Sequence, residues 1–288
     1  MGNKRKFFGF LVMVFCVLAC SVTAFAAGTS MKNKKWLSGQ GGAYVDKDKD
    51  GELEYQDYGT SYYKIKIPKQ GYMIVDVKVS ELPGAGKYQE QENEDGFGED
   101  TEEGSTFVNL LNSSKKTIYK NDNYFGSKSK FSFSWAVKKG TYYLAVGGSQ
   151  KYKIRYSFTP VAKINKAGNR LKAAASLKKG VTVKNLLFDA EESHYYKINV
   201  PKKSKVTVSI NSKIKETNLD MGLFLQLLVI RGNTYHFVDE NGKILPKDDP
   251  VSWVFKGKDK CVCNLPKGTY YLRVGSYSTT GYYTLKWN

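Results

Sequence analysis

An acidic segment near the N-terminus has the residue types and the spacing of a calcium loop. Its carboxylates lie at Asp46, Asp48, Asp50, Glu52 and Asp57. A loop of the EF-hand type carries oxygen ligands at positions 1, 3, 5 and 12 and a glycine at position 6, where Gly51 stands here. Because Ca²⁺ is a hard cation that prefers oxygen ligands, the segment predicts a calcium site. The alternative is an ordinary solvated hairpin turn at residues 49–51.

Two features distinguish this segment from a helix–loop–helix pair. Asp57 is shorter than the glutamate usual at position 12, so it is a poorer bidentate ligand. The glycine-rich residues 39–42 that precede the loop are unsuited to an entering helix. A calcium loop here is therefore expected on a β scaffold.

Residues for catalysis are scarce. The chain has only two histidines, His194 and His236, which excludes a metalloprotease helix motif with two histidine ligands four residues apart. It also lacks the Gly-x-Ser-x-Gly turn that carries a nucleophilic serine. His194 takes the place of Ser61 in an internal repeat, which favours a surface position on a strand. We therefore expect no active site and no enzymatic activity.

The internal repeat organises the chain. Residues 61–69 and 194–202 share the pattern Tyr-Tyr-Lys-Ile-x-x-Pro-Lys, and residues 139–147 and 267–275 share Lys-Gly-Thr-Tyr-Tyr-Leu-x-Val-Gly. The two patterns stand at nearly the same separation in both copies, which predicts a duplicated domain. We expect domains at residues 27–162 and 163–288.

The elements of each copy read as antiparallel strands. Apolar residues alternate with polar ones, for example Tyr63, Ile65 and Ile67 against Tyr62 and Lys64. Period-two alternation with one polar face is typical of strands packed on one side. The predicted fold is all-β, with two tandem antiparallel β-sandwiches of the jelly-roll type.

This alternation sends several tyrosines and basic residues away from the predicted core. The candidate ligand-binding residues are Tyr62, Tyr143, Tyr195, Tyr271, Lys64, Lys66, Lys197 and Arg273. Exposed aromatic rings beside cations suit stacking on sugars or peptides and contact with anionic groups. The alternative is that neighbouring loops cover the tyrosines.

The N-terminus and the charge indicate location and partners. A basic start, an apolar run to Cys20 and the small residues of Ala24–Ala26 predict a signal peptide over residues 1–26, with lipidation at Cys20 as the less favoured alternative. The formal net charge is +18, so an exported chain should attract wall polymers, acidic polysaccharides or anionic lipid, with nucleic acid not expected. Cys261 and Cys263 are expected to be buried in a strand, with a disulfide between them as the less favoured alternative.

The repeated Tyr-Tyr-Lys-Ile and Lys-Gly-Thr-Tyr-Tyr-Leu patterns resemble the bacterial pre-peptidase C-terminal domain, and they are similar to the collagen-binding domains of clostridial collagenases. The resemblance covers most of residues 50–288. It implies a non-catalytic, jelly-roll-like β-sandwich, usually appended to a secreted peptidase. In the collagen-binding members it implies calcium near the N-terminal linker and ligand contact through surface tyrosines.

Together these patterns predict a secreted or surface-retained, monomeric binding or adhesion protein that recognises an extracellular polysaccharide, wall polymer or matrix protein. The alternatives are a structural surface protein without a discrete ligand and an accessory part of a secreted peptidase system. Salt-dependent retention on cell walls would separate electrostatic attachment from specific recognition.

Overall fold

The structure is a computed structural model of the whole chain. It describes residues 28–40, 45–47, 53–55, 60–80, 106–120, 130–148, 151–214, 222–246, 250–255, 257–276 and 280–288. These residues form β-strands, turns and one short 3₁₀ helix, η2 (Leu171–Ala173), and no α-helix occurs among them. No helix in the described ranges is long and apolar enough to cross a membrane. The all-β prediction is confirmed.

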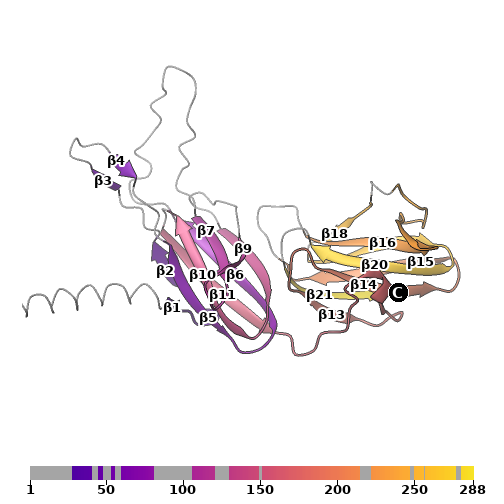
Figure 1. Cartoon of the computed structure of the whole chain (residues 1–288), viewed down its shortest axis with the longest axis horizontal. Helices are drawn as coiled ribbons and strands as arrows, with labels where there is room; N and C mark the ends of the chain where they lie inside the picture. The colour runs from indigo at the N-terminus through magenta and orange to yellow at the C-terminus, as the bar shows by residue number, and fades with distance from the viewer. Residues whose placement is uncertain are drawn as a thin grey trace, which may run out of the picture.

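The first copy is a sandwich of two sheets (Figure 1). One sheet has the order β1-β5-β10-β7-β8 and the other β2-β11-β6-β9. The strands of the first sheet are β1 (Thr29–Ser30), β5 (Ser61–Ile67), β10 (Gly140–Gly148), β7 (Thr106–Leu111) and β8 (Thr117–Tyr119). Those of the second are β2 (Leu37–Gln40), β11 (Lys151–Pro160), β6 (Gly71–Ser80) and β9 (Lys130–Val137). A separate hairpin joins β3 (Val45–Lys47) to β4 (Leu53–Tyr55).

The second copy repeats this order, with sheets β12-β14-β20-β16-β17 and β13-β21-β15-β19. The strands of the first sheet are β12 (Ala175–Ser176), β14 (Ser193–Val200), β20 (Gly268–Ser276), β16 (Leu223–Arg231) and β17 (Thr234–Phe237). The strands of the second are β13 (Val183–Leu187), β21 (Gly281–Trp287), β15 (Ser204–Ser212) and β19 (Lys258–Leu265). An additional strand, β18 (Trp253–Phe255), pairs with β16. Each strand of one order has a counterpart in the other, so the structure carries a duplicated fold.

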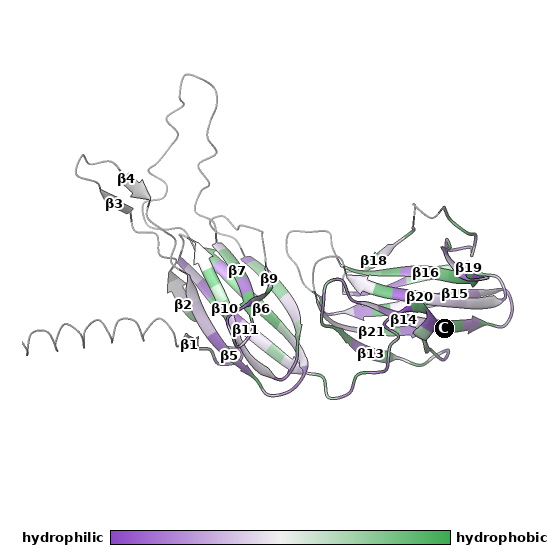
Figure 2. Ribbon diagram, in the orientation of Figure 1, coloured by the Kyte–Doolittle hydropathy of each residue, from purple (hydrophilic) through white to green (hydrophobic). Residues whose placement is uncertain are grey.

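Each sandwich encloses its own apolar core, because alternate residues of every long strand point between the two sheets. Figure 2 shows this alternation as bands of contrasting hydropathy along the strands. Ile65, Val75 and Leu144 are fully buried in the first core. Leu225, Leu272 and Leu285 lie at 1% exposure or less in the second. The polar residues between them therefore lie on the outer faces of the sheets.

Candidate functional site

The sequence-predicted tyrosine sites fall on two separate surfaces. On the first sandwich, Lys64 lies directly opposite Tyr143 on the neighbouring strand, with Tyr62 on the same face. Tyr143 is buried, with only 8% of its surface exposed, so the expectation of an exposed Tyr143 is wrong. The Lys115 ammonium lies 5.7 Å from the Tyr143 ring centroid and 5.1 Å from that of Tyr62. Tyr143 is therefore covered by neighbouring residues, which was the alternative to an exposed ring. Tyr62 and Lys64 are half-buried, and Lys66 is exposed.

On the second sandwich, Tyr195 lies opposite Arg273, and Lys197 opposite Tyr271. Tyr195 and Tyr271 are half-buried. Arg273 donates hydrogen bonds to Ser193 Oγ at 3.1 Å and to Gln226 Oε1 at 3.2 Å. Its guanidinium also lies 5.4 Å from the centre of the Phe224 ring. Arg273 therefore has partners within its own sheet, and Lys197 is the exposed cation of this set.

The predicted calcium ligands lie largely outside the described residues. Asp48, Asp50, Glu52 and Asp57 are not among them, and of Asp46 only the backbone is described, in β3. The backbone of Asp46 pairs with that of Glu54 where β3 and β4 run antiparallel. Calcium binding here stays a prediction, as does the signal peptide over residues 1–26, which also lies outside the described part of the chain.

His194 does not lie on the surface as expected. It is 6% exposed and forms part of a polar network inside the second sandwich. Its Nδ1 lies 2.7 Å from the hydroxyl of Tyr283, which lies 2.8 Å from that of Tyr196. Asn185 Nδ2 donates to the Tyr196 hydroxyl at 3.1 Å. At the other end, His194 Nε2 lies 2.9 Å from Glu192 Oε1.

A carboxylate, an imidazole and a phenol in series can relay a proton, but here the series ends inside the core. Tyr283 has no exposed surface, and burial raises its pKa well above the ordinary value. Burial opposes ionisation of Glu192, but hydrogen bonds from His194 and from the backbone N–H of Phe188 outweigh it and hold the pKa of Glu192 below its usual value. The network therefore links β13, β14 and β21 between the two sheets, and its inner end is buried.

The two sandwiches meet at a junction with buried polar contacts. Ser134 Oγ donates to the carbonyl oxygen of Thr280 at 3.1 Å, and the Ala136 N–H donates to Thr280 Oγ1 at 3.1 Å. Ser134 and Thr280 are both fully buried. Leu186 packs with Ala136 in a small apolar cluster at the same place. The two hydrogen bonds hold Thr280, directly before β21, against β9.

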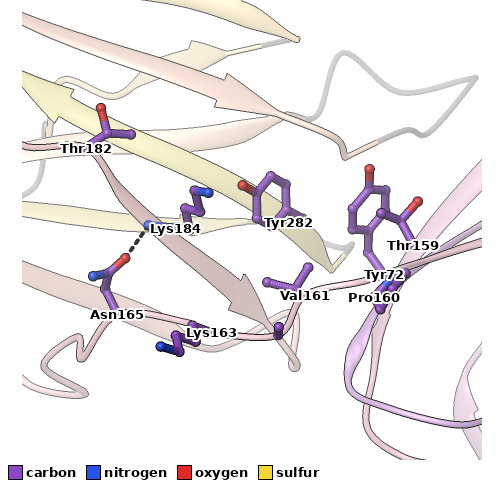
Figure 3. A pocket seen from close by; sticks show the side chains of 10 residues that line it. Tyr72, Thr159, Pro160, Val161, Lys163, Asn165, Thr182, Lys184 and Tyr282 are labelled. Carbon is purple, nitrogen blue, oxygen red and sulfur yellow. Dashed lines mark hydrogen bonds between the residues drawn. The ribbon is translucent and has the colours of Figure 1, made fainter.

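Beside this junction lies a cleft of about 530 Å³. Figure 3 shows Tyr72 and Thr159 on its first-sandwich side and Tyr282 and Lys184 on its second-sandwich side. The rings of Tyr72 and Tyr282 stack with centroids 5.4 Å apart and an angle of 18° between their planes. Burial raises the pKa of Tyr282, so its hydroxyl stays protonated at neutral pH and can donate a hydrogen bond.

Cationic and amide groups also line the cleft. Lys163 and Lys184 are exposed, and neither has an ion-pair partner among the described residues. The side-chain oxygen of Asn165 accepts a hydrogen bond from the backbone N–H of Lys184 at 2.7 Å (Figure 3). This bond fixes the Asn165 side chain at the rim of the cleft. None of the described lining residues is a carboxylate. A concave site with paired aromatic rings, hydroxyl groups and unpaired lysines suits an anionic ligand that also carries hydroxyl groups.

The sequence patterns did not identify Tyr72, Tyr282, Lys163 and Lys184 as ligand-binding residues. Because Met73 and Tyr283 are buried, period-two alternation places their neighbours Tyr72 and Tyr282 on the outer faces of the sheets. This alternation was the sequence signal that could have pointed to the two tyrosines. Their meeting depends on how the copies dock, which strand periodicity does not specify. In the described part of the chain, no group of three or more histidine, cysteine, aspartate or glutamate side chains is arranged to hold a metal.

Comparison with known proteins gives no sequence match and only distant structural ones. No known protein family matches the sequence, and no curated protein does. The resemblance to the pre-peptidase C-terminal domain therefore stays a proposal.

Three solved structures illustrate the weak structural matches. Tripeptidyl peptidase 2 is 12% identical with a TM-score of 0.25 over 90% of this chain, which spans only 24% of that protein. A protein from Eubacterium rectale described as secreted is also 12% identical, with a TM-score of 0.25, over 88% of this chain and 73% of its own. The CUB1-EGF-CUB2 region of human MASP-1/3 is 7% identical, with a TM-score of 0.20, over 88% and 99%. None of these similarities bears on function.

Proposed function

We propose that this chain is a secreted, non-catalytic binding protein that attaches to an extracellular anionic polymer through the cleft between its two sandwiches. The observation that carries the proposal is the lining of this cleft, where the Tyr72–Tyr282 stack adjoins Lys163 and Lys184 and no lining residue that the structure describes is a carboxylate. The formal net charge of +18 supports it, because such a chain attracts polyanions over long range. Export rests on the signal-peptide pattern of residues 1–26.

Lysine and tyrosine have complementary tasks in this proposal. Lys163 and Lys184 are mobile point charges that follow anionic groups without a fixed geometry. The tyrosine rings offer apolar surface, and their hydroxyls offer hydrogen bonds. A polysaccharide or wall polymer with repeated acidic groups presents anionic groups to the lysines, and its hydroxyl groups and apolar surface to the tyrosines. A purely structural role would leave the cleft without a ligand and is the competing reading.

The test compares two matched double variants on an immobilised acidic polysaccharide and on a neutral one. K163Q/K184Q removes the two cleft lysines. K64Q/K66Q removes the same charge from the sheet face of the first sandwich that carries Tyr62 and Tyr143, which we call its tyrosine face. We expect K163Q/K184Q to weaken binding by roughly two- to thirty-fold, because each exposed charge pair contributes about 0.2–1 kcal/mol. K64Q/K66Q should change it by less. Polymer length after incubation should be unchanged.

Equal binding of the acidic and the neutral polymer would contradict electrostatic recognition. A larger loss in K64Q/K66Q would move the site to the tyrosine face. Shortening of the polymer would show catalysis and overturn the non-catalytic assignment.

Calcium binding by the acidic hairpin is a second, separate proposal. Without a cation, the predicted ligand carboxylates repel one another at short range, so bound calcium should stabilise the first sandwich. Extracellular sites of this kind have dissociation constants of about 10⁻⁴–10⁻³ M, so millimolar calcium should raise the melting temperature measurably in wild type. The double variant D48A/D50A should lose this response. A wild-type melting curve that is the same with calcium and with chelator would identify the segment as an ordinary hairpin.

A further inference from the structure

Beyond the cleft, one outer face of the second sandwich has an unusual composition. We call it the lysine face: Lys184, Lys258, Lys260 and Lys286 with Ser209, Asn211 and Thr284 between them. These side chains point outward from the sheet β13-β21-β15-β19, because the alternating residues Ile210 and Leu285 are buried. In the part of the chain that the structure describes, none of the four ammonium groups has an ion-pair partner.

The first copy supplies an internal reference for this face. In the first sandwich, Asp76 lies between Arg155 and Ser132 on the neighbouring strands. In the second, the corresponding cross-strand positions are Ser209 between Lys286 and Lys260. The same place in the fold thus holds an acid flanked by a base in one copy and a serine flanked by two lysines in the other.

In the first copy, the charged groups at this position are paired with each other. Arg155 donates to Asp76 Oδ2 from both Nε and Nη2, at 3.1 and 2.7 Å, and Ser132 Oγ donates to Asp76 Oδ1 at 2.7 Å. The Trp36 ring lies 4.5 Å from the Arg155 guanidinium and 4.8 Å from the Lys78 ammonium. The fold is therefore built at this place without free lysines. In the second copy, Lys286 and Lys260 lie on the strands to either side of β15, about 10 Å apart, and no described carboxylate pairs with either of them.

The lysine face is continuous with the cleft. Lys184 belongs to both, and from it the row Lys184, Thr284, Asn211 and Lys258 crosses the four strands of the sheet. With strands about 4.8 Å apart, this row spans about 14 Å, and Lys258 and Lys260 are about 7 Å apart along their strand. The face thus offers charges at intervals suited to a chain with regularly repeated anionic groups.

We infer that the lysine face extends the cleft into a continuous binding surface for a linear acidic polysaccharide, with Ser209, Asn211 and Thr284 bonding to sugar hydroxyls between the charged groups. This rests on the proposed function of the cleft and adds the ligand class and its path. Polyol-phosphate polymers share the repeated charge but lack the sugar rings, so the experiment separates the two.

The test uses two triple variants of equal charge change. K258Q/K260Q/K286Q alters the lysine face outside the cleft. K130Q/K151Q/K153Q alters the corresponding face of the first sandwich. Dissociation constants are measured at low salt for a long polyuronate, for a short oligouronate and for a polyol phosphate, after circular dichroism has shown that all variants fold as wild type.

We expect the lysine-face variant to bind the long polyuronate about tenfold more weakly, from the summed loss of three exposed charge pairs, and the control variant less than about twofold more weakly. Binding of the short oligomer should be weakened by K163Q/K184Q and unchanged by K258Q/K260Q/K286Q. Equal affinities of the two triple variants for the long chain would overturn the inference while leaving the cleft function intact. Binding of the polyol phosphate alone would overturn the ligand class. Absence of binding by wild type would overturn both proposals.

Discussion

Single residues show where the two copies have diverged in chemistry. Ser61 and His194 stand at equivalent places, but His194 joins a buried network with Tyr283 and Tyr196. The first copy keeps the corresponding tyrosine pair, Tyr63 and Tyr152, with hydroxyls 2.8 Å apart. His194 has the same parity along its strand as buried Tyr196, so the burial was predictable from the alternation. The comparison with Ser61 alone led to the wrong expectation of a surface position.

Replacing His194 by alanine should destabilise the second sandwich by about 1–3 kcal/mol, since the Tyr283 hydroxyl loses a partner in a buried site. His236→Ala is the matched control, and a half-buried position in an edge strand should change stability by about 0.5 kcal/mol or less. Urea unfolding of both variants measures the difference. Equal stability of the two would mean that the network contributes nothing to the fold.

Glu192 makes this network sensitive to acid. Because its pKa is lowered in the folded state, its contribution to stability is complete above the unfolded value, about 4.5, and is lost as the pH falls through the folded value. Wild type should therefore lose stability below about pH 4.5 more steeply than Glu192→Gln. Unfolding curves collected between pH 3 and 7 decide this. Parallel pH profiles for the two proteins would exclude the role of Glu192.

At the scale of elements, the sequence predicted strand positions and core faces well, because period-two alternation is strong in both copies. Packing between strands was less accessible. Gly39 of β2 and Asn185 of β13 occupy the same register position, opposite Tyr152 and Tyr283. The cores fill this place differently: Gly39 leaves room for tyrosine hydroxyls, and Asn185 bonds to one. Neither arrangement can be read from local periodicity.

This difference predicts the effect of a methyl group. At Gly39 a Cβ would overlap the hydroxyls of Tyr63 and Tyr152. Gly39→Ala should therefore destabilise the first sandwich by about 1–3 kcal/mol through overpacking. Gly180→Ala, where a Cβ meets nothing within 4 Å but the φ of +76° is strained, separates a backbone effect from crowding. A stable Gly39→Ala protein with unshifted tyrosine signals would contradict the packing described for this core.

The buried cysteines show a second substitution between the copies. Cys261 and Cys263 lie opposite Val208 and Val206, the places where β9 carries Phe133 and Trp135 opposite Val75 and Met73. Both thiols are free and buried. The contact with Cys263, together with burial, raises the pKa of the Cys261 thiol. The pair thus fills core positions as small apolar residues, as the sequence predicted.

At the scale of the whole molecule, the candidate site depends on how two similar sandwiches dock. Tyr72 and Tyr282 are far apart in sequence and come together because Thr280 bonds across the junction to the backbone of Ala136. The sequence indicated an outward direction for each tyrosine, but docking geometry depends on shape and on buried polar contacts between copies. The sequence therefore predicted a basic, aromatic binding surface at Tyr62, Tyr143, Tyr195 and Tyr271, none of which lines this cleft, and ligand binding by them stays a prediction.

The most direct test of the central claim is to map lysine acetylation by mass spectrometry with and without a bound acidic polysaccharide. We expect the polymer to slow modification of Lys163 and Lys184 severalfold, while Lys66 and Lys153 react at unchanged rates. Protection of Lys64, Lys66 or Lys197 with no protection of Lys184 would contradict it and return the binding site to the tyrosine faces of the separate sandwiches.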